Sequence, residues 1–202
     1  MNSIFDLVTS QLGSSQLGQI QSQVGLDEST ARKAVPAAVG TLLGALAKNS
    51  QNASGAEALL GALSKDHDGS ILNDLSSVLG GSQGISAGEG ILKHVLGGKR
   101  AAVENGLGQS LGVNQQQIGQ LLAMLAPVIM GALGKAKKEQ GFDAGSLARS
   151  LGQERSALER KMPSGLGGLG SLLDADGDGS IVDDLAQKAA GGFFKRLLGG
   201  RR

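Results

Sequence analysis

The residues whose types and spacing best fit a chemical role are three aspartates late in the sequence. Asp174, Asp176 and Asp178 alternate along the chain, and Gly179 follows at the sixth position of the run. EF-hand-type calcium loops begin in this way, because alternate positions point successive oxygens at one centre and glycine permits the sharp turn. Ser180, at the seventh position, would add a backbone carbonyl. The sequence therefore predicts a calcium site in this loop.

The second half of the loop departs from the EF-hand pattern. Leu185 stands at position twelve, where a bidentate glutamate is expected, and Asp183 and Asp184 occupy positions ten and eleven. We expect Asp184 to turn inward and complete the site, with an affinity at the weak end, on the order of 10⁻⁴–10⁻³ M. The predicted metal ligands are then Asp174, Asp176, Asp178, Ser180 and Asp184.

A second interpretation of this loop needs no ion. Asp-Gly steps favour turns, and Ser180 suits the N-cap of a helix. Asp183 at the third helical position would favour the positive end of the helix. On this interpretation the acidic loop is only a turn with helix caps, and both interpretations stay open at the sequence level.

The acidic loop also belongs to an internal repeat. Asp66–Leu75 aligns without gaps onto Asp176–Leu185, with seven of ten positions identical. The earlier copy has Ser64 where the later one has Asp174, and His67 replaces a glycine. It therefore has fewer carboxylates in the calcium pattern, and we predict a purely structural turn for it.

The two copies follow similar helical segments. Each segment contains a proline followed four residues later by a glycine, at Pro36 and Gly40 and again at Pro127 and Gly131. Proline removes a backbone donor and crowds the preceding turn, so we expect each helix to kink there. Two diverged repeat units are expected on this basis.

The pattern of apolar residues is helical throughout. Between Ala31 and Leu46 they recur every three or four residues, and Asp27 stands ahead of them as an N-cap. Asn114 and Gln117 form a variant of the capping box before the most apolar helix. Its uncharged run, Leu121–Leu133, is shorter than the roughly 20 residues of a membrane span. With no period-two strand pattern, we predict an all-α, compact multi-helix bundle with short Gly-rich loops.

Composition narrows the classes of protein further. The chain has 202 residues, with 34 glycines, four phenylalanines, and no cysteine, tryptophan or tyrosine. Disulfide scaffolds, cysteine–zinc sites and aromatic stacking platforms are therefore excluded. We expect small residues, such as the Gly-x-x-x-Gly pair Gly40 and Gly44, to let neighbouring helices approach closely.

No catalytic motif stands out. The sequence lacks His-Glu-x-x-His and the phosphate-binding Gly-x-x-x-x-Gly-Lys-Ser/Thr pattern, and no Gly-x-Ser-x-Gly stands between a strand and a helix. The only histidines, His67 and His94, are 27 residues apart, and we expect His94 to be an ordinary helix residue rather than a ligand. We therefore predict a protein that is not an enzyme.

Charge does not favour nucleic acid as a partner. The net charge is +1, and the most basic interval is interleaved with acids, so it is expected to form solvated helix faces with weak ion pairs. That interval contains Lys135, Lys137, Lys138, Arg149, Arg155, Arg160 and Lys161. We predict no nucleic-acid binding.

The last twelve residues form an amphipathic segment. Its apolar residues are Phe193, Phe194, Leu197 and Leu198, and its basic residues are Lys195, Arg196, Arg201 and Arg202. Such a segment could seal the core, dock on a protein partner or a second copy, or lie on an anionic membrane surface. The chain begins without a basic, apolar leader pattern, so we expect no signal peptide and a cytoplasmic protein.

Several segments resemble a known family. They are Gly90-Ile-Leu-Lys-His-Val-Leu-Gly97, Gly112-Val-Asn-Gln-Gln-Gln-Ile, Leu125-Ala-Pro-Val-Ile-Met-Gly-Ala-Leu133, the opening Phe5-Asp-Leu and the Pro36 helix. Together they make residues 1–140 similar to the bacterial YidB-like family, a domain of unknown function. The resemblance implies an all-α fold and brings no catalytic residues with it.

We therefore expect two parts: a YidB-like helical domain over residues 1–140 and a C-terminal helical extension over 141–202. The expected function is that of a non-enzymatic structural or interaction protein, modulated by calcium through residues 174–184. The alternative is a peripheral membrane or envelope-associated protein, anchored by its C-terminal amphipathic segment.

Overall fold

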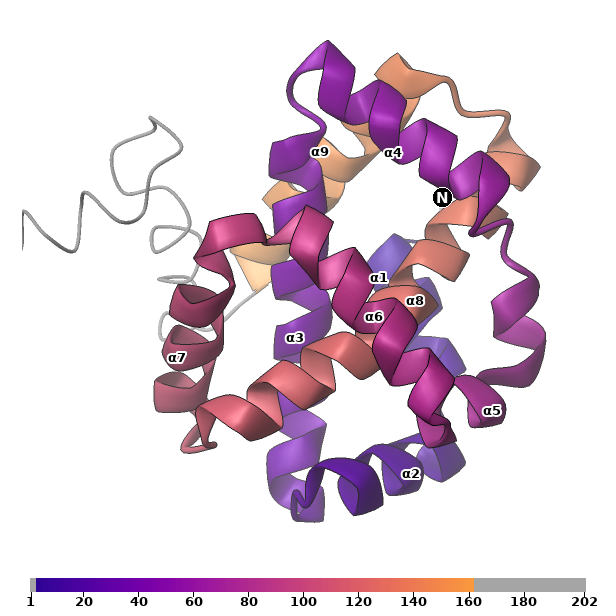
Figure 1. Cartoon of the computed structure of the whole chain (residues 1–202). Helices are drawn as coiled ribbons and strands as arrows, with labels where there is room; N and C mark the ends of the chain where they lie inside the picture. Colours follow the sequence, from indigo (N-terminus) through magenta and orange to yellow (C-terminus); the bar gives the residue numbers. More distant parts are fainter. Residues whose placement is uncertain (1–2, 162–202) are drawn as a thin grey trace, which may run out of the picture.

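Helix α8 (Gln115–Gln140) runs through the middle of the protein, and the other helices pack around it (Figure 1). The structure is a computed structural model that describes residues 3–161, and over that range it contains helices and turns but no strand. The predicted all-α bundle is confirmed. The remaining elements are α1 (Ile4–Gln11), α2 (Ser14–Val24), α3 (Glu28–Asn49), α4 (Ala53–Lys65), η1 (Ser70–Asp74), α5 (Leu75–Gly80), α6 (Ser82–Val95), η2 (Gly97–Lys99), α7 (Arg100–Leu111) and α9 (Ala144–Lys161).

The apolar run in α8 explains its central place. All residues from Leu121 to Gly134 are buried, because α3, α6 and α7 cover the helix on different sides. Among the residues described, α8 is the one helix long and apolar enough to cross a membrane, yet 89% of its most apolar window is buried inside the protein. That burial is the environment of a core helix, as the sequence predicted for Leu121–Leu133. Both Pro36 and Pro127 lie inside continuous helices, α3 and α8.

Three helix–helix corners share one local design. In each, a glycine with positive φ ends one helix, an apolar residue follows, and an Asp or Asn then caps the next helix. The three corners are Gly25-Leu26-Asp27, Gly112-Val113-Asn114 and Gly141-Phe142-Asp143. In each case the amide of the apolar residue donates to the carbonyl five residues back, which closes the end of the helix.

The predicted caps are present, with one correction. The Asp27 carboxylate accepts the Thr30 amide at 3.0 Å, and the Asn114 side chain accepts the Gln117 amide at 2.8 Å. The capping box expected at Asn114 is only half formed, because the Gln117 side chain does not turn back to it. Its Nε2 donates instead to the Val24 and Gly25 carbonyls, at 3.1 and 2.9 Å. Gln117 thereby joins the start of α8 to the end of α2.

Glycines let other segments approach α8 at backbone distance. A methyl group on Gly88 of α6 would overlap the Ala123 carbonyl, and one on Gly134 would overlap the His67 carbonyl. Gly131 lies directly under Ile71. Close approach through small residues is thus present at these three glycines. The close approach predicted at Gly44 is not found among the described residues, because an added methyl group there would meet nothing within 4 Å.

The first acidic copy, Asp66–Leu75, forms the connection from α4 to α5 and lies against α8. Asp68 accepts the Ser70 amide at 3.0 Å, and Asp74 accepts the Ser77 amide at 3.2 Å. Both carboxylates therefore act as caps, as predicted for a structural turn. The second copy, Asp176–Leu185, lies outside the described residues.

Candidate functional site

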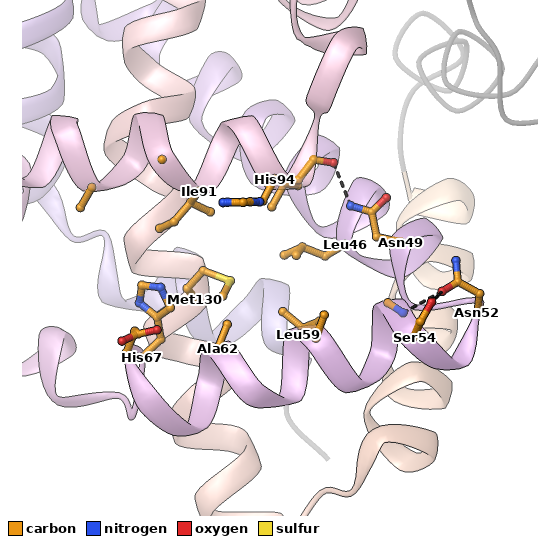
Figure 2. Close-up of a pocket in the computed structure, with 16 residues that line it drawn as sticks. Leu46, Asn49, Asn52, Ser54, Leu59, Ala62, His67, Ile91, His94 and Met130 are labelled. Atoms are coloured by element: carbon orange, nitrogen blue, oxygen red, sulfur yellow. Dashed lines mark hydrogen bonds between the residues drawn. The ribbon is translucent and has the colours of Figure 1, made fainter.

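A groove of about 900 Å³ lies between α4 and α6. Its floor comes from α3 and α8, so four separate parts of the chain build it. It is lined by Leu46, Asn49, Asn52, Ser54, Gly55, Ala58, Leu59, Ala62, Asp66, His67, Ala87, Gly90, Ile91, His94, Val95 and Met130. Figure 2 shows the labelled apolar side chains of these residues extending into the space between the two helices.

The floor of the groove is apolar and firmly held. Leu46 of α3 and Met130 of α8 are each only 4% exposed, and both belong to the main hydrophobic core. Leu59 on α4 and Ile91 on α6 are half-buried and extend this apolar surface up the walls. The rest of each wall carries small side chains, which leaves the groove wide: Ala58 and Ala62 on α4, and Ala87 and Gly90 on α6.

Hydrogen bonds close one end of the groove. The Asn49 side chain donates to the Val95 carbonyl at 2.9 Å, which ties the last residue of α3 to the last residue of α6 (Figure 2). Asn52 caps α4 by accepting the Gly55 amide at 2.7 Å, and Ser54 Oγ donates to the same Asn52 oxygen at 2.9 Å. The first bond joins the floor helix α3 to the wall α6, and the other two hold the start of the wall α4.

The other end of the groove contains His67 and Asp66, where the chain leaves α4. Burial lowers the pKa of His67, and the nearby Asp66 charge opposes that shift. His94 is exposed on α6, as expected for an ordinary helix residue. The sequence did not predict that both histidines line one groove, because only the packing of α4 and α6 against α8 brings them there.

The polar groups of the groove lining are few. In residues 3–161 no group of three or more His, Asp or Glu side chains could hold a metal ion. Ser54 Oγ, the one hydroxyl among the lining residues, donates to Asn52 rather than to a basic group. What the groove offers is an apolar floor between two helical walls.

A separate polar cluster joins α6, α7 and α8 on another side of the protein. Arg100 donates to Glu104 at 2.6 Å and binds Glu89 through both of its terminal nitrogens. Gln115 donates to Glu104 at 3.1 Å. The hydrogen bonds of Arg100 with Glu89 and Glu104 raise the pKa of Arg100, and Arg100 lowers the pKa of Glu89. The sequence analysis missed Glu104, which is 7% exposed, and the cluster acts as a structural clamp around it.

The basic interval forms ion pairs along helix surfaces, as predicted for solvated faces. Lys135 lies 3.9 Å from Glu139, and Arg155 lies 2.8 Å from Glu159, each pair one helical turn apart. Pairs of this kind contribute only tenths of a kcal/mol, roughly 0.3–0.5 each.

The residues that the sequence proposed for chemistry lie outside the described part of the chain. They are the calcium ligands Asp174, Asp176, Asp178, Ser180 and Asp184, and the amphipathic residues Phe193, Phe194, Leu197 and Leu198. The groove between α4 and α6 is therefore a candidate site that the sequence did not indicate.

The fold and groove define an all-helical domain built around one buried helix. The family model described as "Bacterial protein of unknown function (DUF937)" matches residues 6–136, and the chain belongs to that family. The YidB-like resemblance agrees with this membership. No curated protein and no solved structure matches the chain.

Proposed function

We propose that this protein is a non-enzymatic interaction module whose groove between α4 and α6 binds the apolar face of a partner helix. The observation that carries the proposal is the groove itself, with the buried floor of Leu46 and Met130 between two helical walls. An amphipathic helix laid into such a groove buries its apolar anchors while its polar face stays in water.

The lining also limits the charge of the partner. Asp66 is the one carboxylate among the lining residues, and no lysine or arginine lines the groove. A helix with basic residues beside its apolar face would therefore meet no like charge at the groove. The small wall residues Ala58, Ala62 and Ala87 favour large anchors on the partner, because bulky side chains then fill the space that the walls leave.

The calcium component of this proposal concerns the second acidic copy. In the first copy, Asp68 and Asp74 accept backbone amides, and Asp178 and Asp184 stand at the equivalent positions of the repeat. Asp174 and Asp176 remain as the charges that most need a cation. Calcium bound by Asp174, Asp176, Asp178, Ser180 and Asp184 would order the chain after the loop and so regulate the module.

Calcium binding is tested by the thermal melting of the full chain. We expect millimolar calcium to raise the melting temperature of the natural sequence and to leave D174N/D176N unchanged. The same melting temperature with and without calcium would reject the calcium component, while the groove proposal would stand.

The groove is tested by photo-cross-linking of the full-length protein in its own bacterial host. A benzoylphenylalanine is placed at Ala58 on one wall, at Ala87 on the other, and at the exposed Ala101 of α7 as the matched control. Mass spectrometry then identifies the cross-linked peptide. We expect the same apolar helical segment to be trapped from Ala58 and Ala87 and not from Ala101.

An Ala62→Trp variant sharpens that experiment. Ala62 is half-buried and lines the groove. A tryptophan there should fill the groove and abolish both adducts, and the melting temperature of the variant shows whether the fold is kept. Adducts that form equally from Ala101, or that survive Ala62→Trp, would show that the groove is not the binding site.

A further inference from the structure

The chain contains one segment with the chemistry that the groove is proposed to bind. Beyond Lys161, the sequence carries Phe193 and Phe194 followed by Leu197 and Leu198. At helical spacing these four side chains share one face. The other two phenylalanines of the chain, Phe5 and Phe142, are half-buried and pack against the core. An apolar face of this size is expected to find a protein surface as well.

The internal repeat supports docking of this segment on protein. In the first copy, α6 begins seven residues after Leu75, packs against α8 and forms one wall of the groove. In the second copy, Phe193 stands eight residues after Leu185. The segment thus occupies the position in its repeat that a packed helix occupies in the first.

The length of the connection allows the segment to reach the groove. Phe193 lies 32 residues after Lys161, the end of α9. A flexible chain of that length spans about 30 Å on average, whereas a domain of this size has a radius of gyration of about 15 Å. Helix α9 also packs against α4, which is one of the two walls. One wall of the groove therefore adjoins the last described helix, and the length of the connection spans the domain.

Charge and size agree with this occupant. Lys195 and Arg196 flank the apolar face, and Asp66 is the one formally charged acid among the residues that line the groove. The alanines and the glycine of the walls are small, so the groove of about 900 Å³ has space for large side chains above Met130.

We propose that residues 193–198 dock in the groove between α4 and α6 of the same chain, so that a partner helix must displace them. This inference rests on the proposed function, since it names the resident ligand of the same groove. It makes the groove self-inhibited, and the affinity for a partner is reduced by the fraction of time the segment occupies the groove.

Disulfide cross-linking of the full chain tests this proposal cleanly, because the natural sequence has no cysteine. The test pair is Ala62→Cys with Leu197→Cys, and the matched control is Ala101→Cys with Leu197→Cys. We expect the groove pair to form an intramolecular disulfide at least about tenfold faster than the control pair, because docking raises the local concentration of the thiol. Adding F193S/F194S should reduce the rate of the groove pair to that of the control.

Two results would overturn the proposal: equal rates for the two cysteine pairs, or a disulfide-linked dimer in place of the intramolecular product. If the rates are equal and the protein also binds anionic phospholipid vesicles in a way that F193S/F194S abolishes, the segment is assigned to a membrane surface. In each case, trapping of another protein's helix from Ala58 and Ala87 would still support the groove as a binding site. Failure of the docking proposal can therefore be told apart from failure of the proposed function.

Discussion

The two faces of α6 have opposite relations to their neighbours. On one face, Gly88 lies so close to α8 that a methyl group would overlap the Ala123 carbonyl. On the other face, Gly90 lines the groove, and a methyl group there would meet nothing within 4 Å. These glycines are two residues apart on one helix. Packing against α8 thus requires a glycine at Gly88, whereas the glycine at Gly90 borders open space.

This difference shows which contacts with α8 the sequence makes tight. Contact with α8 needs a glycine wherever two backbones meet, at Gly88 and again at Gly134. The groove is bounded by the same helix, yet Met130 of α8 forms its floor without any segment of residues 3–161 filling the space above it. Because the packing beside it is tight, the groove is a feature of the fold and does not reflect poor packing of the whole domain.

The largest effect is expected from Gly88→Ala. The new methyl group meets a backbone carbonyl, so α6 must move away from α8 or α8 must bend. We expect the free energy of unfolding to fall by about 3 kcal/mol or more, the upper end for overpacked cores. Chemical denaturation of the full chain measures this loss.

Gly90→Ala is the matched control on the open face. Alanine is a better helix former than glycine and meets no neighbour there, so we expect a gain of about 0.5–1 kcal/mol. Equal losses from the two substitutions would mean that both faces of α6 are packed, and the contrast between them would disappear.

An intermediate effect on stability is expected from Arg100→Leu, in the polar cluster that joins α6, α7 and α8. Glu104 is buried and would lose its charged partner, which we expect to cost roughly 2 kcal/mol. The control is Arg32→Leu, whose partner Glu28 is 65% exposed like Arg32 itself; here the change should stay within about 0.5 kcal/mol. Similar values for both variants would remove Arg100 from the account of stability.

The smallest effect is the pH dependence of stability that His67 contributes. His67 lines the groove, and its backbone carbonyl lies against Gly134 of α8. Burial lowers the pKa of His67 below its ordinary value of 6.5. Between the two values the unfolded chain binds more protons than the folded one, so the free energy of unfolding decreases as pH falls through 6.5. His67→Gln should flatten this part of the pH profile. An unchanged slope in melting temperature from about pH 8 to about pH 5 would contradict it.

Local features of the fold could be predicted from the sequence. The helix period between Ala31 and Leu46, the cap at Asp27 and the turn at Asp68 depend on neighbours within a few residues, and all three are present. The apolar run of α8 predicted a core helix, because a helix that is apolar on all sides over thirteen residues is stable only when it is buried.

Features that depend on distant neighbours could not be predicted. Gln117 was expected to complete its own capping box, but the end of α2 lies closer to its amide. Gly44 was expected to permit close packing, but an added methyl group there would meet no atom of residues 3–161 within 4 Å. The groove was missed for the same reason, since its walls and floor come from four helices and only the complete fold brings them together.

The central claim is that the groove above Met130 accepts an apolar helix, and methyl NMR of methionine tests it most directly. Met130 is 4% exposed in the floor of the groove, whereas Met124, six residues earlier in α8, is fully buried and serves as an internal control. Full-length F193S/F194S protein is titrated with a short amphipathic Leu/Lys peptide. The account predicts a saturable shift of the Met130 methyl resonance with Met124 unmoved. A Met130 resonance that stays in place, or that moves only together with Met124, would contradict it.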